Sequence, residues 1–233
     1  MATIPFNPRK SQTDSSVGSG DQIALRVLRV AVSILFAWVL WQILREYRWY
    51  FPANFSESAF LSGRRYTFDG WYPAAFYIHI ITGPIVLLAS AALMTPEFRN
   101  GWPRWHRRLG RVHIGVLLLL MVPSGLAMAM KAYSGPVAGT GFAMHGIVTG
   151  LCAVMAITHA RRRNFSVHQA WATRCFLMLC APLLLRLING AIQVAGAQST
   201  FTYQLIAWIS WLLPMLIHEI WRAIKSRSPS ANG

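Results

Sequence analysis

The sequence predicts an all-α protein, a polytopic transmembrane helical bundle with about six spans and a four-helix core formed by spans two to five. Composition gives the first indication: 55% of the 233 residues are hydrophobic and only 12% are charged, about half the charged share of an ordinary soluble domain. The charges also gather in short blocks, and the apolar runs between them approach the ~20 residues that cross a bilayer core. Because no water satisfies the backbone there, each run is expected to form a helix.

Six apolar runs are candidate spans, and the first and last have the least sharply marked edges. They cover residues 27–44, 71–95, 112–130, 139–160, 171–195 and 202–217. Residues 1–20 are rich in Ser, Gly, Asp and Pro, and they are expected to form a disordered cytoplasmic tail because they have little apolar surface to bury. Residues 21–225 are predicted to form one transmembrane domain, and residues 226–233 a flexible C-terminal tail.

The distribution of basic residues predicts that both termini are cytoplasmic. With the N-terminus inside, the cytoplasmic segments carry 16 Lys and Arg residues and the outer loops carry 5, while Arg186 lies within the fifth span. Lys and Arg favour the cytoplasmic side of a membrane. The net charge of +15 is therefore explained by blocks at membrane edges, which meet anionic lipid. The lipid bilayer is the expected partner, nucleic acid is not, and homo-oligomerisation is left open.

Four histidines lie at depths that suit two stacked b-type haems. At ~1.5 Å per residue, His79 in the second span and His145 in the fourth lie at similar depth in the outer half. His113 in the third span and His168 near the fifth lie toward the inner face. A bis-histidine haem needs two neutral imidazoles at equal depth on facing helices. These four residues are candidate metal ligands for haem b, and Arg186 is a candidate partner for a haem propionate.

The same residues also support an interpretation without haem. Intramembrane histidines can form hydrogen bonds between helices. An arginine well inside a span costs several kcal/mol unless it is paired or reaches water. No acidic residue lies within a predicted span, so the candidate partners of Arg186 are backbone carbonyls, a haem propionate, a quinone oxygen or an anionic substrate. Snorkelling toward the outer surface is the remaining alternative.

A second polar group is predicted near the inner face. The segment WHRRLGR at residues 105–111 contains His106, Arg108 and Arg111, and Arg174 follows in the fifth span. Contact with lipid phosphate is the favoured role for the basic segment. The sequence has no paired-carboxylate site, no nucleophile with a base, no phosphate-binding loop and no zinc spacing. Hydrolase and kinase activities are therefore not supported, and whether the protein is an enzyme is left open.

Three passages resemble a large bacterial family of multi-pass membrane proteins known only by a domain-of-unknown-function label. They are YIHI followed by GP within residues 77–84, WHRRLGR at 105–111, and RRRNF leading through His168 and Arg174 to LRL within 161–187. The resemblance implies a multi-pass protein of the bacterial cytoplasmic (inner) membrane but no agreed activity. It also implies that His113 and His145 are less typical than His79, His106 and His168. A more distant, geometric likeness is to transmembrane di-haem cytochromes b.

The leading functional prediction is a membrane electron carrier or quinol-linked oxidoreductase that holds b-type haem. The alternative is a haem-free transporter, or a lipid- or anion-binding membrane protein, that uses the same histidines and arginines. In either case His79, His145 and Arg186 are expected around one cavity in the outer half of the membrane. Three polar side chains that faced lipid separately would each cost about 2–3 kcal/mol, and a shared cavity recovers most of that.

Overall fold

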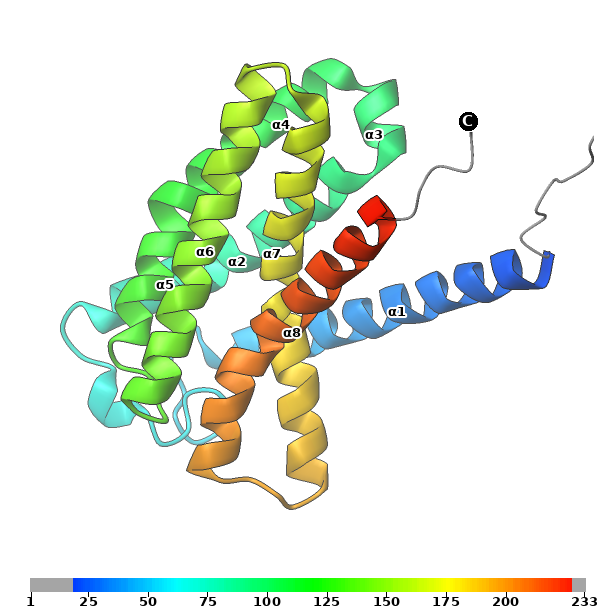
Figure 1. The fold of residues 1–233 in the computed structure, drawn as a ribbon. Helices are drawn as coiled ribbons and strands as arrows, with labels where there is room; N and C mark the ends of the chain where they lie inside the picture. Colours follow the sequence, from blue (N-terminus) through cyan, green and yellow to red (C-terminus); the bar gives the residue numbers. More distant parts are fainter. Residues whose placement is uncertain (1–18, 228–233) are drawn as a thin grey trace, which may run out of the picture. The chain divides into compact units, whose positions relative to one another are not determined.

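The computed structural model describes residues 19–227 and confirms the all-α prediction (Figure 1). The described chain consists of helices joined by turns and loops, with one isolated β-bridge between Tyr50 and Ala53 and no longer strand. The α-helices of the described chain are α1 Ser19–Arg45, α2 Tyr72–Met94, α3 Pro96–Gly101, α4 Pro103–Val116, α5 Val122–Ala129, α6 Pro136–Arg161, α7 Phe165–Val194 and α8 Thr200–Arg227. Shorter elements are the 3-10 helices η1 Glu46–Trp49 and η2 Arg65–Thr67 and the π-helical turn η3 Leu117–Met121.

Six helical segments in the described chain are long and apolar enough to cross a membrane, as predicted. They are Gln22–Trp49, Tyr72–Met94, Pro103–Ala129, Pro136–Arg161, Phe165–Val194 and Thr200–Arg227. The third, which joins α4, η3 and α5, begins nine residues earlier than the predicted 112, and the last ends ten residues later than the predicted 217. The charges at these ends do not stop a helix, because long basic side chains reach the interface while the backbone stays helical. Of the two predicted tails, only residues 19–20 and 226–227 fall among the described residues, where they begin α1 and end α8.

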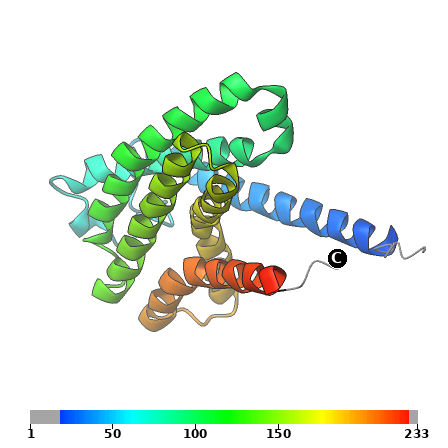
Figure 2. The same ribbon diagram turned by 45° about the horizontal axis from the view of Figure 1, so that its top comes forward.

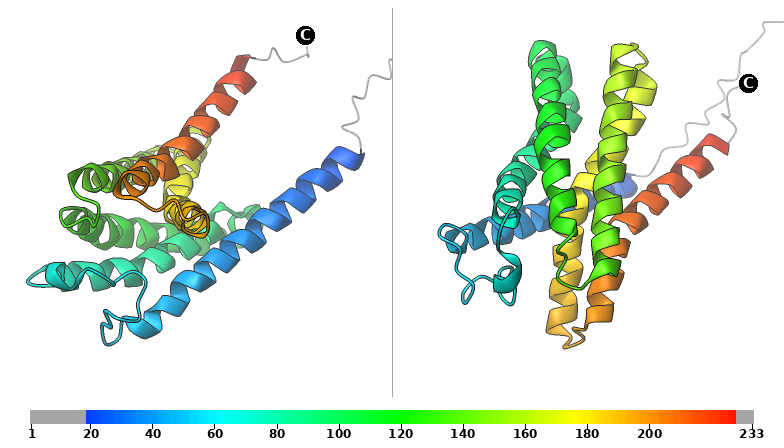
Figure 3. Two further views of the ribbon diagram at one scale, coloured as in Figure 1. Left: turned by 90° about the horizontal axis from the view of Figure 1, so that it is seen from below. Right: turned by 90° about the vertical axis from the view of Figure 1, so that its left-hand side faces the viewer.

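The chain divides into two compact units, Met1–Trp38 and Val39–Gly233. The described part of the first unit is helical, residues 19–38 of α1. Within the second unit, the connections lie alternately at two ends of the helices (Figures 1 and 3). The end that holds residues 46–71 and the α5–α6 and α7–α8 turns is called the loop end here. The α2–α4 connection and the α6–α7 turn lie at the opposite end.

Spans two to five share a common core. Val86 from α2, Leu117 and Met121 from η3, Cys152 from α6 and Leu179 from α7 belong to one buried cluster. Because lipid is as apolar as these side chains, close packing rather than water exclusion holds such helices together. Gly139 in α6 shows how close the approach is, since a Cβ there would lie 2.6 Å from the carbonyl oxygen of Ala129. Figure 2 shows α5 and α6 side by side.

The sixth span packs on this core rather than standing apart from it. Trp211 of α8 is buried with Met178 and Ala181 of α7. Near the loop end, the indole of Trp208 donates a hydrogen bond to the carbonyl of Val137 at 3.1 Å. Span six therefore closes one side of the space between α6 and α7.

Residues 46–71 form an ordered cover at the loop end. Tyr50 and Leu61 from this segment are buried against Tyr72 and Phe76 of α2. Lys131, just after α5, donates a hydrogen bond to the carbonyl of Thr67 at 3.2 Å and forms an ion pair with Asp69. The segment is thus fixed at both its aromatic middle and its polar end.

Candidate functional site

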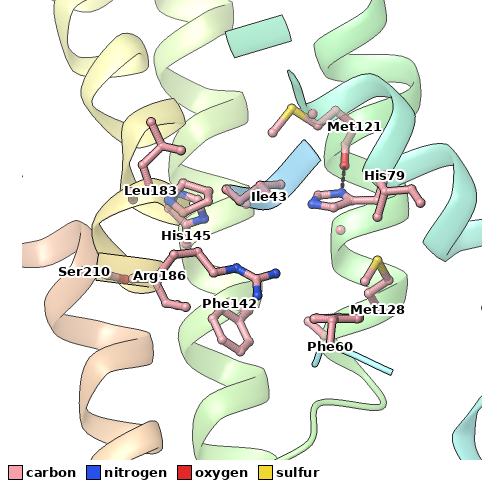
Figure 4. A pocket seen from close by; sticks show the side chains of 18 of the residues that line it. Ile43, Phe60, His79, Met121, Met128, Phe142, His145, Leu183, Arg186 and Ser210 are labelled. Carbon is pink, nitrogen blue, oxygen red and sulfur yellow. Dashed lines mark hydrogen bonds between the residues drawn. The ribbon is translucent and has the colours of Figure 1, made fainter. Parts of the chain in front are cut away.

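A cavity of about 360 Å³ lies within the second unit, where residues of the 46–71 segment meet α2, α5, α6, α7 and α8. His79, His145 and Arg186 all line it, so the structure brings together the three residues that the sequence predicted would share one cavity. Figure 4 shows His79 projecting from α2, His145 from α6 and the guanidinium of Arg186 reaching into the space between them. In the part of the chain that is described, no Asp or Glu lines the cavity. Five tyrosines that were not singled out from the sequence do so: Tyr47, Tyr50, Tyr72, Tyr133 and Tyr203.

His79 is held by the irregular backbone of the third span. Its Nδ1 lies 3.2 Å from the carbonyl oxygen of Met121, the last residue of the π-helical turn η3. Such turns disturb the regular i→i−4 pattern and recur at functional sites. Gly125, one turn further on, makes room for the ring, because a Cβ there would lie 2.9 Å from the imidazole Cε1. The close approach of these two helices therefore depends on the π turn and on a glycine.

His145 is held by a carbonyl that a proline has freed. Its Nε2 lies 2.9 Å from the carbonyl oxygen of Met178 in α7. The residue four positions later is Pro182, inside the same helix. Proline has no N–H and cannot donate the usual helical bond to the carbonyl at i−4. The Met178 carbonyl is consequently available to the histidine.

A second carbonyl freed by a proline is used between η1 and α2. The Tyr47 hydroxyl donates a hydrogen bond to the carbonyl of Ile80, four residues before Pro84 within α2. Two polar side chains of the cavity are thus fixed by carbonyls that prolines release. The sequence contained a usable signal, a proline four residues after each acceptor, but it did not show which side chain would reach the freed carbonyl.

These partners assign the tautomers of the two neutral histidines. A carbonyl oxygen only accepts hydrogen bonds, so the ring nitrogen that faces it carries the proton. His79 is therefore protonated at Nδ1 and His145 at Nε2. The lone pair that remains is on Nε2 of His79 and on Nδ1 of His145.

Arg186 has no carboxylate partner among the described residues. Its guanidinium carbon lies 5.4 Å from the centre of the Phe60 ring, which is close enough for a cation–π contact. It also lies within electrostatic range of Tyr50: burial raises the pKa of the Tyr50 phenol, and Arg186 is the strongest influence in the opposite direction. The positive charge therefore lies near the Phe60 ring and lines the cavity, with no carboxylate partner in the described chain.

The predicted inner histidines lie elsewhere and do not line the cavity. His113 on α4 is only 6% exposed, and its buried Nε2 has no hydrogen-bond partner in the described chain. His168 on α7 faces the carbonyl of Ala156 through Nδ1 at 2.8 Å. His106 packs beside Phe98, with ring centres 6.2 Å apart. The structure thus separates these residues from the pair formed by His79 and His145.

The predicted basic group toward the opposite end makes local contacts, and its contact with lipid phosphate stays a prediction. Arg174 forms a two-pronged ion pair with Glu219 of α8, with N···O distances of 2.6 and 2.9 Å. Arg108 lies over the Trp105 ring at 5.5 Å, and the Nε of Arg111 is 3.3 Å from the carbonyl of Arg107. The partner of Arg174 was missed from the sequence because Glu219 lies beyond the predicted end of the sixth span. The structure extends that helix to Arg227.

The histidines can be compared directly with the needs of haem b. His79 suits an axial ligand, because its Nδ1 is fixed by a carbonyl and its Nε2 carries a free lone pair. His145 does not match it, because its Nε2 is engaged with Met178. His113 and His168 share no cavity with either of them. Across the described residues, no cluster of three or more His, Cys, Asp or Glu side chains is placed to hold a bare metal ion. The arrangement therefore fits one axial ligand and does not fit a bis-histidine haem.

The six candidate spans are those of an integral membrane protein, and the cavity lined by His79, His145 and Arg186 is a candidate binding site inside it. The chain belongs to the family described as predicted membrane protein (DUF2306), which matches residues 76–222. This confirms the resemblance to a domain-of-unknown-function family, whereas the likeness to di-haem cytochromes b stays a prediction. The matched region contains His79, His145 and Arg186, whereas the 46–71 segment lies outside it. No curated protein and no solved structure matches the chain.

Proposed function

We propose that this protein is a haem-free membrane protein that binds an anionic, amphipathic small molecule in the cavity, with Arg186 as the counter-charge. One observation carries the proposal: a guanidinium in the fifth span lines a cavity in which the described chain places no carboxylate. A charge within a membrane is costly unless it is paired or solvated. A bound anion would supply the missing partner, and arginine suits carboxylate and phosphate groups because its planar fork donates in pairs.

The polarity of the lining supports an amphipathic ligand. Helix α2 begins at the loop end with Tyr72, so Leu87 lies deeper in the bundle. Helix α7 runs toward the loop end, so Leu179 lies deeper than Arg186. Arginine and tyrosine therefore line the cavity near the loop end, and leucines line it further in. A head group near Arg186 with an apolar tail toward Leu87 and Leu179 would match both regions.

We further propose that the loop end faces outward and that the protein lies in a bacterial cytoplasmic membrane with both termini inside. The support is the excess of basic residues in the segments assigned to the opposite end and to the termini, 16 against 5. In this orientation the cavity opens from the outer half of the bilayer. Cysteine labelling would test it: a cysteine at Arg162 should react only from the cytoplasmic side, and one at Tyr66 only from outside.

Binding can be tested with the purified protein in phosphatidylcholine nanodiscs. Dodecanoate and dodecyl phosphate should raise the Tm, because a ligand that binds only the folded state stabilises it, whereas dodecanol should not. The variant R186Q should lose the increase, and R162Q should keep it, because Arg162 is exposed at the opposite end, away from the cavity. Equal stabilisation of R186Q and wild type would contradict the proposal, as would a neutral quinone that raises the Tm while both anions do not.

A b-type haem carrier remains a second candidate because one observation favours it. The Nε2 of His79 faces the cavity with a free lone pair, as an axial ligand must. Haem bound there would supply electron transfer, and Arg186 would be available to its propionates. Protein purified from haem-replete cells should show no Soret band if the primary proposal is right. A Soret band that H79A removes, with Arg186 intact, would favour the second candidate.

A further inference from the structure

A second arginine enters the cavity from the 46–71 segment, outside the region that the family match covers. Arg64 lines the cavity together with Arg186. Its guanidinium carbon lies 4.2 Å from the centre of the Phe60 ring and 4.8 Å from that of Tyr133. The guanidinium is therefore held between two aromatic rings, one from its own segment and one from the turn after α5.

The two arginines share one aromatic ring. The guanidinium carbons of Arg64 and Arg186 lie 4.2 and 5.4 Å from the centre of the Phe60 ring. The distance between the two carbons therefore cannot exceed the sum of these two distances. Both also act on the buried phenol of Tyr50, where each opposes the rise in pKa that burial causes. Glu46 also acts on the Tyr50 phenol, and its carboxylate accepts hydrogen bonds from Ser58 Oγ at 3.3 Å and the Ala59 N–H at 3.1 Å.

The position of Arg64 is fixed by the backbone around it. Gly63, which precedes it, has a φ of +70°, and the space beside its Cα is closed by the Tyr133 ring at 3.5 Å from an ideal Cβ. The Arg64 N–H donates to the carbonyl of Leu61 at 2.9 Å, and its own carbonyl accepts from the Thr67 hydroxyl at 2.8 Å. Lys131 holds the end of the same segment. Arg64 is thus presented to the cavity by an ordered turn.

Resting on the proposed function, we infer that Arg64 and Arg186 together select a phosphate monoester as the head group of the ligand. One bidentate guanidinium engages both oxygens of a carboxylate and balances its single negative charge. A phosphate monoester has three terminal oxygens and carries close to two negative charges above its second pKa of about 6. Two guanidiniums without a carboxylate partner match that charge and that number of acceptors. The source of the phosphate is either a lipid in the bilayer or a soluble phosphate compound.

Affinities for dodecyl phosphate and dodecanoate, measured in phosphatidylcholine nanodiscs at pH 8, test this inference. Wild-type protein should bind dodecyl phosphate at least tenfold more tightly than dodecanoate. R64Q should lose this preference and retain its affinity for dodecanoate, and R64K should recover part of the preference because it restores the charge but not the planar fork. R65Q is the matched control, since Arg65 lies in the same segment over Phe55 and does not line the cavity.

The possible results separate this inference from the proposed function. If R64Q keeps the full preference for phosphate, the inference is wrong and the proposed function stands. If wild type binds neither anion, the proposed function itself fails. Competition identifies the source: displacement by inorganic phosphate assigns a soluble ligand, and displacement only by phosphatidic acid in the bilayer assigns a lipid. Displacement by either competitor supports a phosphate head group. If neither competitor displaces dodecyl phosphate, the inference is wrong.

Discussion

Two arginines on α7, twelve residues apart, differ in whether a carboxylate pairs with them. Arg174 is paired with Glu219 through two short contacts and lies 4.7 Å from the Trp171 ring. Arg186 lies near the loop end, where it has aromatic rings and a cavity but no acid among the described residues. In the sequence both are cations within one apolar span, Arg174 near its inner edge and Arg186 well inside it. The partner, and not the residue type, separates a structural arginine from one that is available to a ligand.

The largest expected effect comes from the contact that places His79 in the cavity. In G125A, the new Cβ would lie 2.9 Å from the imidazole, so the ring or one of the two helices must shift. Overpacking of this kind typically costs about 1–3 kcal/mol, and ligand affinity should fall with it. The control is G115A in α4, where an added Cβ meets nothing within 4 Å and alanine favours the helix. In thermal unfolding, the Tm of G125A should be lower than that of wild type, and the Tm of G115A should be equal to or higher than that of wild type.

The ion pair near the opposite end should contribute to stability and leave binding unchanged. E219Q leaves Arg174, whose side chain is 16% exposed, without a carboxylate. Because the Glu219 side chain is 42% exposed, the free energy of unfolding is expected to fall by only about 1–2 kcal/mol. The double variant R174Q/E219Q should regain part of that loss, since no charge is then left alone. A drop in ligand affinity in E219Q, at unchanged occupancy of the folded state, would contradict the separation of the two sites.

A smaller effect is expected where Pro182 frees the Met178 carbonyl. In P182A, the new N–H competes with His145 for that carbonyl. Helix stability should rise, while the Nε2-protonated tautomer of His145 should become less populated. Nitrogen-15 NMR of labelled histidine reports the tautomer directly. P214A, in α8, is the control because that proline does not serve the carbonyl of Met178. An unchanged His145 spectrum in P182A would show that the freed carbonyl does not set the tautomer.

The smallest effect concerns the exposed ion pair that holds the 46–71 segment. A hydrogen bond from Lys131 lowers the pKa of Asp69 below its usual value. A lowered pKa in the folded state means that the stabilisation is present above the usual carboxyl pKa and is lost as the pH falls through the lowered value. The Tm difference between wild type and D69N should thus be measurable at pH 7 and vanish in strong acid. A difference that grows on acidification would contradict this account.

Much of the fold followed from the sequence because membrane spans are specified locally. Apolar length and flanking charge identified all six segments, and the cost of isolated polar groups in lipid was enough to predict that His79, His145 and Arg186 would face one space. The helix ends were less predictable because charged residues continue a helix into the interface. That error concealed Glu219, and with it the pairing of Arg174. Arg64 was also missed, since nothing local shows that a loop arginine will fold back between Phe60 and Tyr133.

The haem prediction illustrates a limit of spacing arguments. Depth along a helix can be counted, and His79 and His145 do meet at one cavity. Which ring nitrogen is free depends on carbonyls that a π-helical turn and a proline expose, and these are tertiary features. His113 and His168 share an approximate depth, yet neither lines the cavity. Haem binding therefore stays a prediction, supported by the geometry of His79 alone.

The most direct test of the contrast between the two arginines is the Tm of R186Q and R174Q in phosphatidylcholine nanodiscs, with and without dodecyl phosphate. Without ligand, R186Q should be at least as stable as wild type, because it removes a charge that has no acid beside it, while R174Q should be less stable. With ligand, R174Q should keep the increase in Tm and R186Q should lose it. An R186Q protein that is destabilised without ligand but still stabilised by dodecyl phosphate would contradict the account.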